Sequence, residues 1–393
     1  MTAGALADLK ILDFSTLLPG PFASVMLADM GAEVLKISSP AKGDLVTDGK
    51  PECDDFELTA NHMWLNRNKD TLALNLKTPE AIKIVKELVA SYYEVIEQFR
   101  PGVMDRLGLS YEVLSVINPK LIYCSVSAYG QTGPARLQAG HDINFLAKSG
   151  LMSYSGRKEG GPNLWGTQVG DLAVSLYANI AILAAVNYRR LTGEGQYLDV
   201  SMFDGLIPFN ATAGISYLMG ASQPTCESMM LSGGSAYDFY ETADGKYLAV
   251  GSVEPKFWEN LCEVVGAPHY AHAYVFTPQT LEAKCFIAER FKEKTLDEWM
   301  LELEGRDCCV EPVLDMNQCF NEDEHVKERE LIVELDVDGK SVRQYALPIV
   351  FSKSKPCYRH VGKHIGADTE KTLLGLGYSK AEIGKLASRG VFD

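Results

Sequence analysis

Two segments of the chain place a titratable side chain directly after a glycine. One reads Ala139-Gly-His141-Asp-Ile-Asn-Phe145, and the other reads Val169-Gly-Asp171-Leu-Ala173. A histidine and an aspartate that face one carbon atom from opposite sides can remove its proton and return a proton to either face. The pair therefore predicts proton transfer that inverts a stereocentre.

Each of these residues also has an ordinary structural explanation. Asp171 precedes the apolar run 172–186, where an N-cap carboxylate would accept hydrogen bonds from the first free amides of a helix. A lone histidine such as His141 is most often a structural residue. Capping and catalysis are compatible, because a helix N-terminus also stabilises negative charge that develops on a substrate. Both explanations therefore stay open.

Composition limits the class of protein. The 393 residues, 46% hydrophobic and 23% charged, indicate a globular chain that is long enough for two domains. Lys and Arg number 37 against 52 Asp and Glu, for a net charge of −15. Such a charge argues against nucleic acid or an anionic membrane as the main partner, so any phosphate must meet a local basic patch.

Targeting signals and cysteines indicate the compartment. The first ten residues lack the organisation of a signal peptide, and the apolar run 172–186 is shorter than the roughly 20 residues that span a bilayer. The nine cysteines are an odd number without a Cys-x-x-Cys pair, which favours reduced thiols over a disulfide framework or a zinc site. We therefore expect a cytoplasmic protein.

The first half of the chain alternates strand and helix signals. Helices are predicted at 22–30, 78–90 and 172–186, and strands at 9–14, 33–37, 71–76, 93–99, 121–128 and 197–200. This alternation is typical of an α/β fold with a doubly wound parallel sheet. The turn after the first strand lacks Gly-x-Gly-x-x-Gly, which argues against a nicotinamide enzyme.

The second half has a different texture. Asp244-Gly245 lies between apolar runs and predicts an antiparallel hairpin over 237–250, followed by helices near 256–265 and 296–304. A helix is also predicted from 201 to about 219. The predicted organisation is a large domain over 1–200, a linker over 201–230, a small α+β domain over 231–318, and a segment 319–393 that returns to the large domain.

Eight motifs, in order along the chain, carry a resemblance to a known family. They are Leu17-Leu-Pro-Gly-Pro-Phe-Ala23, Leu27-Ala-Asp-Met-Gly-Ala-Glu-Val-Leu-Lys-Ile37, Asn66-Arg-Asn-Lys69, Phe99-Arg-Pro-Gly-Val103, Asp105-Arg-Leu-Gly-Leu109, Tyr129-Gly-Gln-Thr-Gly-Pro134, Gly193-Glu-Gly-Gln196 and Ala243-Asp-Gly-Lys-Tyr247. Together they resemble the family III CoA-transferase (CaiB/BaiF-like) superfamily across the whole chain. Within it, the segments around His141, Asp171 and Glu254 resemble the α-methylacyl-CoA racemase branch.

The resemblance implies a mechanism. His141 and Asp171 would flank the α-carbon of an acyl-CoA thioester, so that one removes the proton and the other reprotonates the enolate. Glu254 would hydrogen-bond the histidine and fix its tautomer, and the amides at the start of the helix after Asp171 would stabilise the oxyanion. No metal or redox cofactor is required, because CoA enters as part of the substrate.

The resemblance also implies the contacts to CoA. They are Leu74, Asn75, Leu76, Lys77, Gln98, Phe99, Arg100, Arg106, Gly140, Asp142 and Asn144. The chain has Ser38-Ser39 at a position where many members of the family have an arginine near the adenosine phosphate. Either Lys36 or Lys42 substitutes for that charge, or CoA affinity is lower. Candidates for the acyl pocket are Met202, Met219, Met229, Met230 and Trp165, although a cluster of methionines is more often plain core.

The family fold further implies an interlocked homodimer, in which Glu254 meets His141 across the subunit boundary. Three functions stay open: racemase or epimerase of a 2-substituted acyl-CoA, CoA-transferase with Asp171 as nucleophile, and non-catalytic CoA binding. The histidine separates the first two, since the aspartate serves both.

Overall fold

The computed structural model describes residues 4–273 and 278–393 and divides into two compact units. The first unit comprises Met1–Phe145, Thr167–Leu206 and Lys327–Asp393, and the second comprises Leu146–Gly166 and Ile207–Val326. Residues 146–166 therefore cluster with the second unit, although the sequence analysis assigned them to the large domain.

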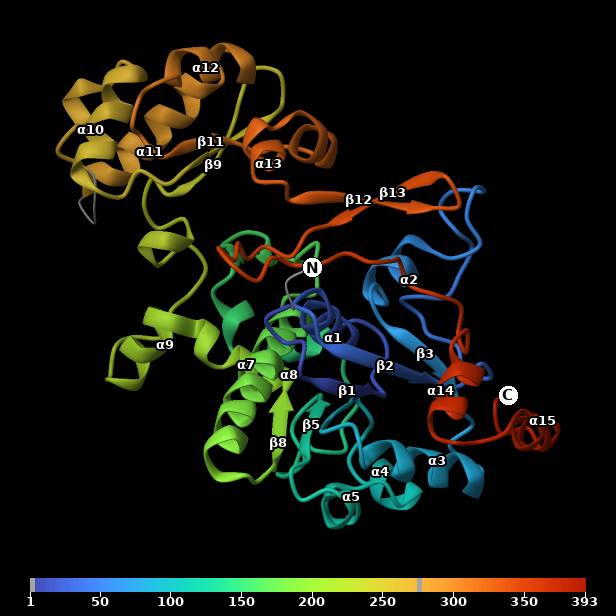
Figure 1. Cartoon of the computed structure of the whole chain (residues 1–393). Coiled ribbons are helices and arrows are strands. Elements are labelled where there is room, and N and C mark those ends of the chain that lie inside the picture. The colour runs from blue at the N-terminus through green and yellow to red at the C-terminus, as the bar shows by residue number, and fades with distance from the viewer. Residues whose placement is uncertain (1–3, 274–277) are drawn as a thin grey trace. The chain divides into compact units, whose positions relative to one another are not determined.

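A six-stranded parallel sheet forms the centre of the first unit (Figure 1). Its strands, in sheet order, are β3 (Asp70–Ala73), β2 (Glu33–Ser38), β1 (Lys10–Asp13), β4 (Glu94–Glu97), β5 (Ile122–Ser127) and β8 (Gln196–Ser201). The prediction of a parallel α/β sheet is confirmed. The strand order reverses between β1 and β4, and this switch point is where α/β sheets bind ligands, beyond the carboxyl ends of the strands.

Helices and the end of the chain cover this sheet. The helices are α1 (Pro19–Asp29), α2 (Ala60–Leu65), α3 (Pro79–Val89), α4 (Val103–Leu107), α5 (Tyr111–Ile117), α6 (Asp142–Lys148), α7 (Val169–Thr192), α8 (Met202–Leu206), α14 (Thr369–Gly375) and α15 (Lys380–Ser388). One buried cluster joins Leu12 and Leu35 of the sheet to Ile84 of α3 and to Leu373 and Val391 near the C-terminus. The hairpin β12 (Ile332–Val337) and β13 (Lys340–Tyr345) completes the unit.

Helix α7 begins earlier and ends later than the predicted run 172–186. Its N-cap is Gln168, so Asp171 lies in the first turn and the prediction of an Asp171 N-cap is wrong. The helix continues past residue 186 because Arg189 pairs with the buried Glu94 at 2.5 Å, and it ends at Gly193, whose φ of 84° suits glycine. By length and composition α7 could cross a membrane, but half of its apolar window is buried within the protein, as in a core helix.

The second unit contains a three-stranded antiparallel sheet in the order β11 (Val310–Pro312), β10 (Tyr247–Val250), β9 (Asp238–Glu241). The predicted hairpin is confirmed, with Gly245 at a φ of 73° in its turn. Its other elements are β6 (Gly156–Arg157), β7 (Gly161–Pro162), α9 (Ala211–Leu218), α10 (Pro255–Val264), α11 (Pro278–Phe291) and α12 (Leu296–Leu303), and α13 (Glu324–Glu328) begins in this unit, which ends at Val326.

In the second half of the chain, one helix was missed and one predicted helix is interrupted. Helix α11 was not predicted, although it packs into the core beside Trp258 and Trp299. The predicted helix from 201 to about 219 is divided into α8 and α9 by a 3₁₀ turn at Pro208–Asn210. Proline lacks the amide hydrogen that a continuous helix would use, so the break falls there.

Candidate active site

A cavity of about 400 Å³ opens at the carboxyl ends of β1, β4 and β5, and both His141 and Asp171 line it. We call it the His141 cavity. The wall also includes Leu17, Gln98, Phe99, Arg100, Arg136, Gly140, Asn144 and Met202. The structure therefore brings together the two residues from which the sequence analysis started, across the switch point of the sheet.

Local hydrogen bonds set the position of His141 just before α6. Its backbone N–H donates to Asn144 Oδ1 at 3.0 Å, and its carbonyl accepts from the Asn144 amide at 2.8 Å. A Cβ on Gly140 would lie 2.6 Å from the Phe145 ring, so only glycine fits there. The backbone of His141 is thus held while its side chain stays exposed.

Asp142 and Gly170 position Asp171 at the start of α7. Asp142 Oδ1 accepts from the Gly170 amide at 2.6 Å and from the Asp171 amide at 3.4 Å. A Cβ on Gly170 would lie 3.0 Å from that oxygen, so glycine permits the approach. The carboxylate of Asp142 therefore ties the His141 segment to α7.

This contact changes two of the predictions. The first turn of α7 does not offer the Gly170 and Asp171 amides to a substrate oxyanion as expected, because Asp142 already uses both. Asp142 itself is buried, with its carboxylate directed to α7, whereas the sequence analysis assigned it to CoA. A carboxylate at a helix N-terminus is a favourable arrangement, which explains why the fold places it there.

The surroundings of Asp171 alter its acidity. Burial, and secondly the negative charge of Asp142, raise the pKa of Asp171 to about 7. A group with such a pKa gives up and takes back a proton with similar ease near neutral pH. The geometry and the acidity together suit an acid-base role in the His141 cavity.

The segment after β4 supplies predicted CoA contacts to the same cavity. Gln98, Phe99 and Arg100 line it, and Gln98 Oε1 accepts from the Gly20 amide at the start of α1 at 2.9 Å. Arg106 lies elsewhere: it lines a cavity of about 500 Å³ whose wall shares Arg100 and Arg136 with the His141 cavity.

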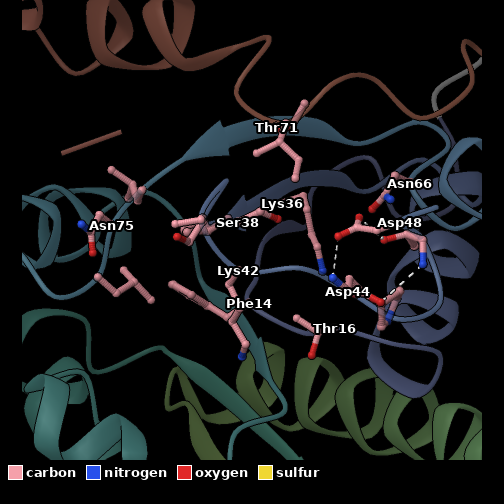
Figure 2. A pocket seen from close by; sticks show the side chains of 18 of the residues that line it. Phe14, Thr16, Lys36, Ser38, Lys42, Asp44, Asp48, Asn66, Thr71 and Asn75 are labelled. Atoms are coloured by element: carbon pink, nitrogen blue, oxygen red, sulfur yellow. Dashed lines mark hydrogen bonds between the residues drawn. The ribbon is translucent and has the colours of Figure 1, made fainter. Parts of the chain in front are cut away.

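Leu74, Asn75, Leu76 and Lys77 line a further cavity of about 470 Å³ (Figure 2). We call it the β2–β3 cavity, because it lies at the ends of those strands. Phe99 lines both this cavity and the His141 cavity, so the two adjoin at that ring. Apart from Arg106 and Asp142, the predicted CoA contacts therefore line two adjoining cavities.

Some residues of the site were not predicted, and some predicted residues are not joined to it. Arg136 lines the His141 cavity, but it lies in a loop whose course the sequence does not reveal. Of the residues proposed for the acyl pocket, Met202 lines this cavity, whereas Met219, Met229, Met230 and Trp165 belong to the second unit. Glu254 is the N-cap residue of α10 in the second unit, and its hydrogen bond to His141 stays a prediction.

Comparison with known proteins adds independent evidence. Residues 6–369 match the family described as CoA-transferase family III. Human succinyl-CoA:glutarate CoA-transferase is 32% identical over 398 residues, which cover 99% of this chain and 90% of that protein. Human alpha-methylacyl-CoA racemase is also 32% identical over 398 residues, covering 99% of this chain and 98% of that protein.

A solved structure has the same fold. The crystal structure of a CAIB/BAIF family protein from Brucella suis superposes with a TM-score of 0.82 at 26% identity, covering 95% of this chain and 100% of that one. The curated relatives include both racemases and transferases, so their names do not separate these two reactions. The chain is an enzyme of the CoA-transferase family III, as its sequence and its fold together identify.

Proposed function

We propose that the protein is a racemase or epimerase of 2-methyl or other 2-substituted acyl-CoA thioesters. The observation that supports this most is that His141 and Asp171 line one cavity from different elements, ahead of α6 and in the first turn of α7. Inversion at an α-carbon needs two proton-transfer groups around one atom.

In this mechanism one residue of the pair removes the α-proton and an enolate forms. The other residue then delivers a proton to the opposite face. Asp171, with a pKa of about 7, would serve as the acid in one direction and as the base in the other. His141, which is exposed toward the cavity, would alternate with it.

The order of the cavities suggests how the CoA thioester binds. Its nucleotide end would occupy the β2–β3 cavity along Leu74–Lys77, and the pantetheine arm would pass Phe99 toward Gln98 and Arg100. The thioester would then reach the two proton-transfer residues.

We also propose that the enzyme is an interlocked homodimer, which would bring Glu254 of one subunit to His141 of the other. Helix α7 supports a partner, since Leu176, Ile180 and Leu191 are exposed on it. Such an apolar stripe is typical of an interface. Light scattering would test the oligomeric state, and a monomer at micromolar concentration would contradict it. The cytoplasmic location stays a prediction.

A CoA-transferase is the second candidate, and the names of relatives such as succinyl-CoA:glutarate CoA-transferase favour it. The Asp171 carboxylate would attack the thioester carbonyl and expel the CoA thiolate, forming a mixed anhydride. The thiolate would then attack the aspartyl carbonyl, release the first carboxylate and leave an aspartyl-CoA thioester for the acceptor acid.

Hydrogen exchange distinguishes the two reactions. A racemase incubated in deuterated water with a 2-methylacyl-CoA incorporates deuterium at the α-carbon without a second acid. A transferase instead moves CoA to added succinate or glutarate. CoA transfer without α-exchange would replace the proposal with the second candidate.

The variant His141→Ala sharpens this test. We expect it to lower α-exchange by about 10³-fold, in the range measured for the loss of a general base, while a transferase reaction would change little. His325→Ala is the matched control, because His325 is an exposed histidine on α13 of the second unit. Exchange at the wild-type rate in His141→Ala would exclude the two-base mechanism.

A further inference from the structure

Five lysines line the β2–β3 cavity, and three of them form ion pairs with aspartates. Lys36 is engaged by Asp13 and the Ser15 carbonyl, and Lys69 by Asp13 at 3.1 Å and the Ser24 hydroxyl at 2.7 Å. Lys363 contacts Asp70 at 2.7 Å and Asp368 at 3.0 Å. These three ammonium groups therefore hold the fold together at the cavity wall.

The other two lysines, Lys42 and Lys77, form no ion pair within the parts of the chain that the structure describes. The Lys42 ammonium lies 5.5 Å from the centre of the Phe99 ring. That ring is common to the β2–β3 cavity and the His141 cavity. Lys42, which Figure 2 shows in the β2–β3 cavity, thus places an unpaired positive charge beside the ring at which the two cavities adjoin.

We propose that Lys42 binds a phosphate group of the CoA nucleotide. The inference rests on the proposed use of an acyl-CoA thioester, and Lys42 suits this role better than Lys36, whose ammonium group Asp13 and the Ser15 carbonyl already engage. A flexible side chain with a compact positive charge suits a phosphate, and charge-assisted contacts are the strong ones. Lys42 follows β2 closely in sequence, so the strand end positions it.

The test compares two substrates that share one acyl group. One is the CoA thioester, and the other is the pantetheine thioester, which has neither nucleotide nor phosphate. We expect Lys42→Gln to raise KM for the CoA thioester about tenfold, with kcat nearly unchanged. KM for the pantetheine thioester should not change.

Lys50→Gln is the matched control, because Lys50 lies in the same connection between β2 and α2, is exposed and forms an exposed ion pair with Asp54 at 3.4 Å. Equal changes in KM for both thioesters, or no change for either, would overturn the role of Lys42. If the wild-type enzyme neither exchanges nor transfers either substrate, the proposed function fails instead.

A different observation concerns Leu17, which lines the His141 cavity with a φ of 62°. This conformation is unfavourable for a residue with a Cβ and persists only where the surroundings hold it. The Leu17 amide donates to Asp44 Oδ2 at 2.8 Å, and the other oxygen of Asp44 accepts from Val46 at 2.9 Å. Asp44 therefore ties the turn after β1 to the connection after β2.

Asp44 belongs to the other cavity. It lines the β2–β3 cavity, where Figure 2 shows it with Asp48 at one end and Asn75 at the other. The Asp44 amide donates to Asp48 Oδ2 at 2.6 Å, which closes the local turn. The Asp44 carboxylate thus forms part of the wall of the β2–β3 cavity. Through its hydrogen bond to Leu17 it also fixes part of the wall of the His141 cavity.

We infer that Asp44 is a positioning residue that holds Leu17 against the reacting group. Unlike the lysine variant, Asp44→Ala should lower kcat about tenfold for both thioesters, because a displaced cavity wall misaligns the reacting groups. Leu17→Gly adopts a positive φ without help, although it also loses its side chain. The double variant should therefore be no slower than Leu17→Gly alone.

Two results would overturn this second inference. The first is a loss of kcat in the double variant that equals the product of the losses in Asp44→Ala and Leu17→Gly. The second is an Asp44→Ala variant in which KM changes and kcat does not. Circular dichroism checks that the variants fold. Asp44→Asn keeps one acceptor oxygen and repeats the cycle with less disturbance if the alanine variant is unstable.

Discussion

Two groups of charged residues lie at the carboxyl ends of the central strands, and the fold treats them in opposite ways. Beneath the β2–β3 cavity, Asp13 is fully buried and accepts from Ser24 at 2.6 Å and Lys69 at 3.1 Å. Burial raises its pKa, but Lys36 and Lys69 outweigh this and hold the pKa of Asp13 well below its usual range. In the His141 cavity, burial beside Asp142 raises the pKa of Asp171 to about 7.

The difference shows what makes a charged residue structural or chemical in this protein. An acid with two cationic partners stays ionised at any pH the enzyme meets, so Asp13 can only organise its neighbours. An acid beside another acid changes its protonation near neutral pH, so Asp171 can move a proton. Four predictions, made on three substitutions, test this contrast.

The largest effect should come from Asp171→Asn, which removes the titratable group and keeps its shape. We expect α-exchange to fall about 10³-fold, since general acid-base groups contribute on that scale. The measurement is deuterium incorporation by mass spectrometry. Asp54→Asn, at an exposed position, is the control. A loss below tenfold would mean that Asp171 is not one of the two proton-transfer groups.

Substitution in the buried group around Asp13 should instead lower the stability of the fold. Lys69→Met leaves Asp13 with one cationic partner fewer in a fully buried site. We expect the free energy of unfolding to fall by about 3 kcal/mol, because an uncompensated buried charge is costly. Denaturant titration measures this. Lys10→Met, at an exposed pair with Glu33, should cost less than about 1 kcal/mol; similar losses for both would remove the contrast.

The raised pKa of Asp171 also predicts a pH effect on stability. Between its ordinary value of 3.8 and about 7, the unfolded chain releases the proton while the folded protein keeps it. Wild-type stability therefore decreases as pH rises through this window and then levels off. Asp171→Asn should be more stable than wild type by about 1–2 kcal/mol at pH 8, after allowance for partial exposure.

Thermal unfolding at pH 4 and pH 8 checks this prediction. The melting temperatures of the two proteins should differ much less at pH 4, where the carboxyl group is protonated in the folded protein and only partly ionised in the unfolded chain. A wild-type protein that gains stability relative to the variant as pH rises would show that Asp171 is stabilised as an anion instead.

The smallest effect should come from Asp142→Asn, which keeps an acceptor for α7 but removes the charge beside Asp171. We expect the pKa of Asp171 to fall, because Asp142 contributes to its upward shift. The limb of the pH–rate profile that reports Asp171 should therefore move to lower pH. An unmoved limb would assign it to another group.

Much of the fold was predictable because it depends on local patterns. Alternating apolar strands and amphipathic helices indicate a parallel sheet wherever its two faces are covered. The exceptions have tertiary causes. Helix α7 runs beyond its apolar segment because Arg189 finds Glu94, a partner distant in sequence. Its start was misplaced because Asp142, a partner distant in sequence, accepts from the Gly170 and Asp171 amides, so the helix begins before Asp171.

The candidate site divides in the same way. Residue types and spacing were enough to select His141 and Asp171, since both follow a glycine that the fold needs for close packing, and motif order was enough to select the family. Other features of the site depend on which groups meet across the sheet. They are the hydrogen bonds from α7 to Asp142, the unpaired charge of Lys42 and the positive φ of Leu17. Acidity and positioning depend on these long-range neighbours, so only the folded chain decides which charges are paired and which can react.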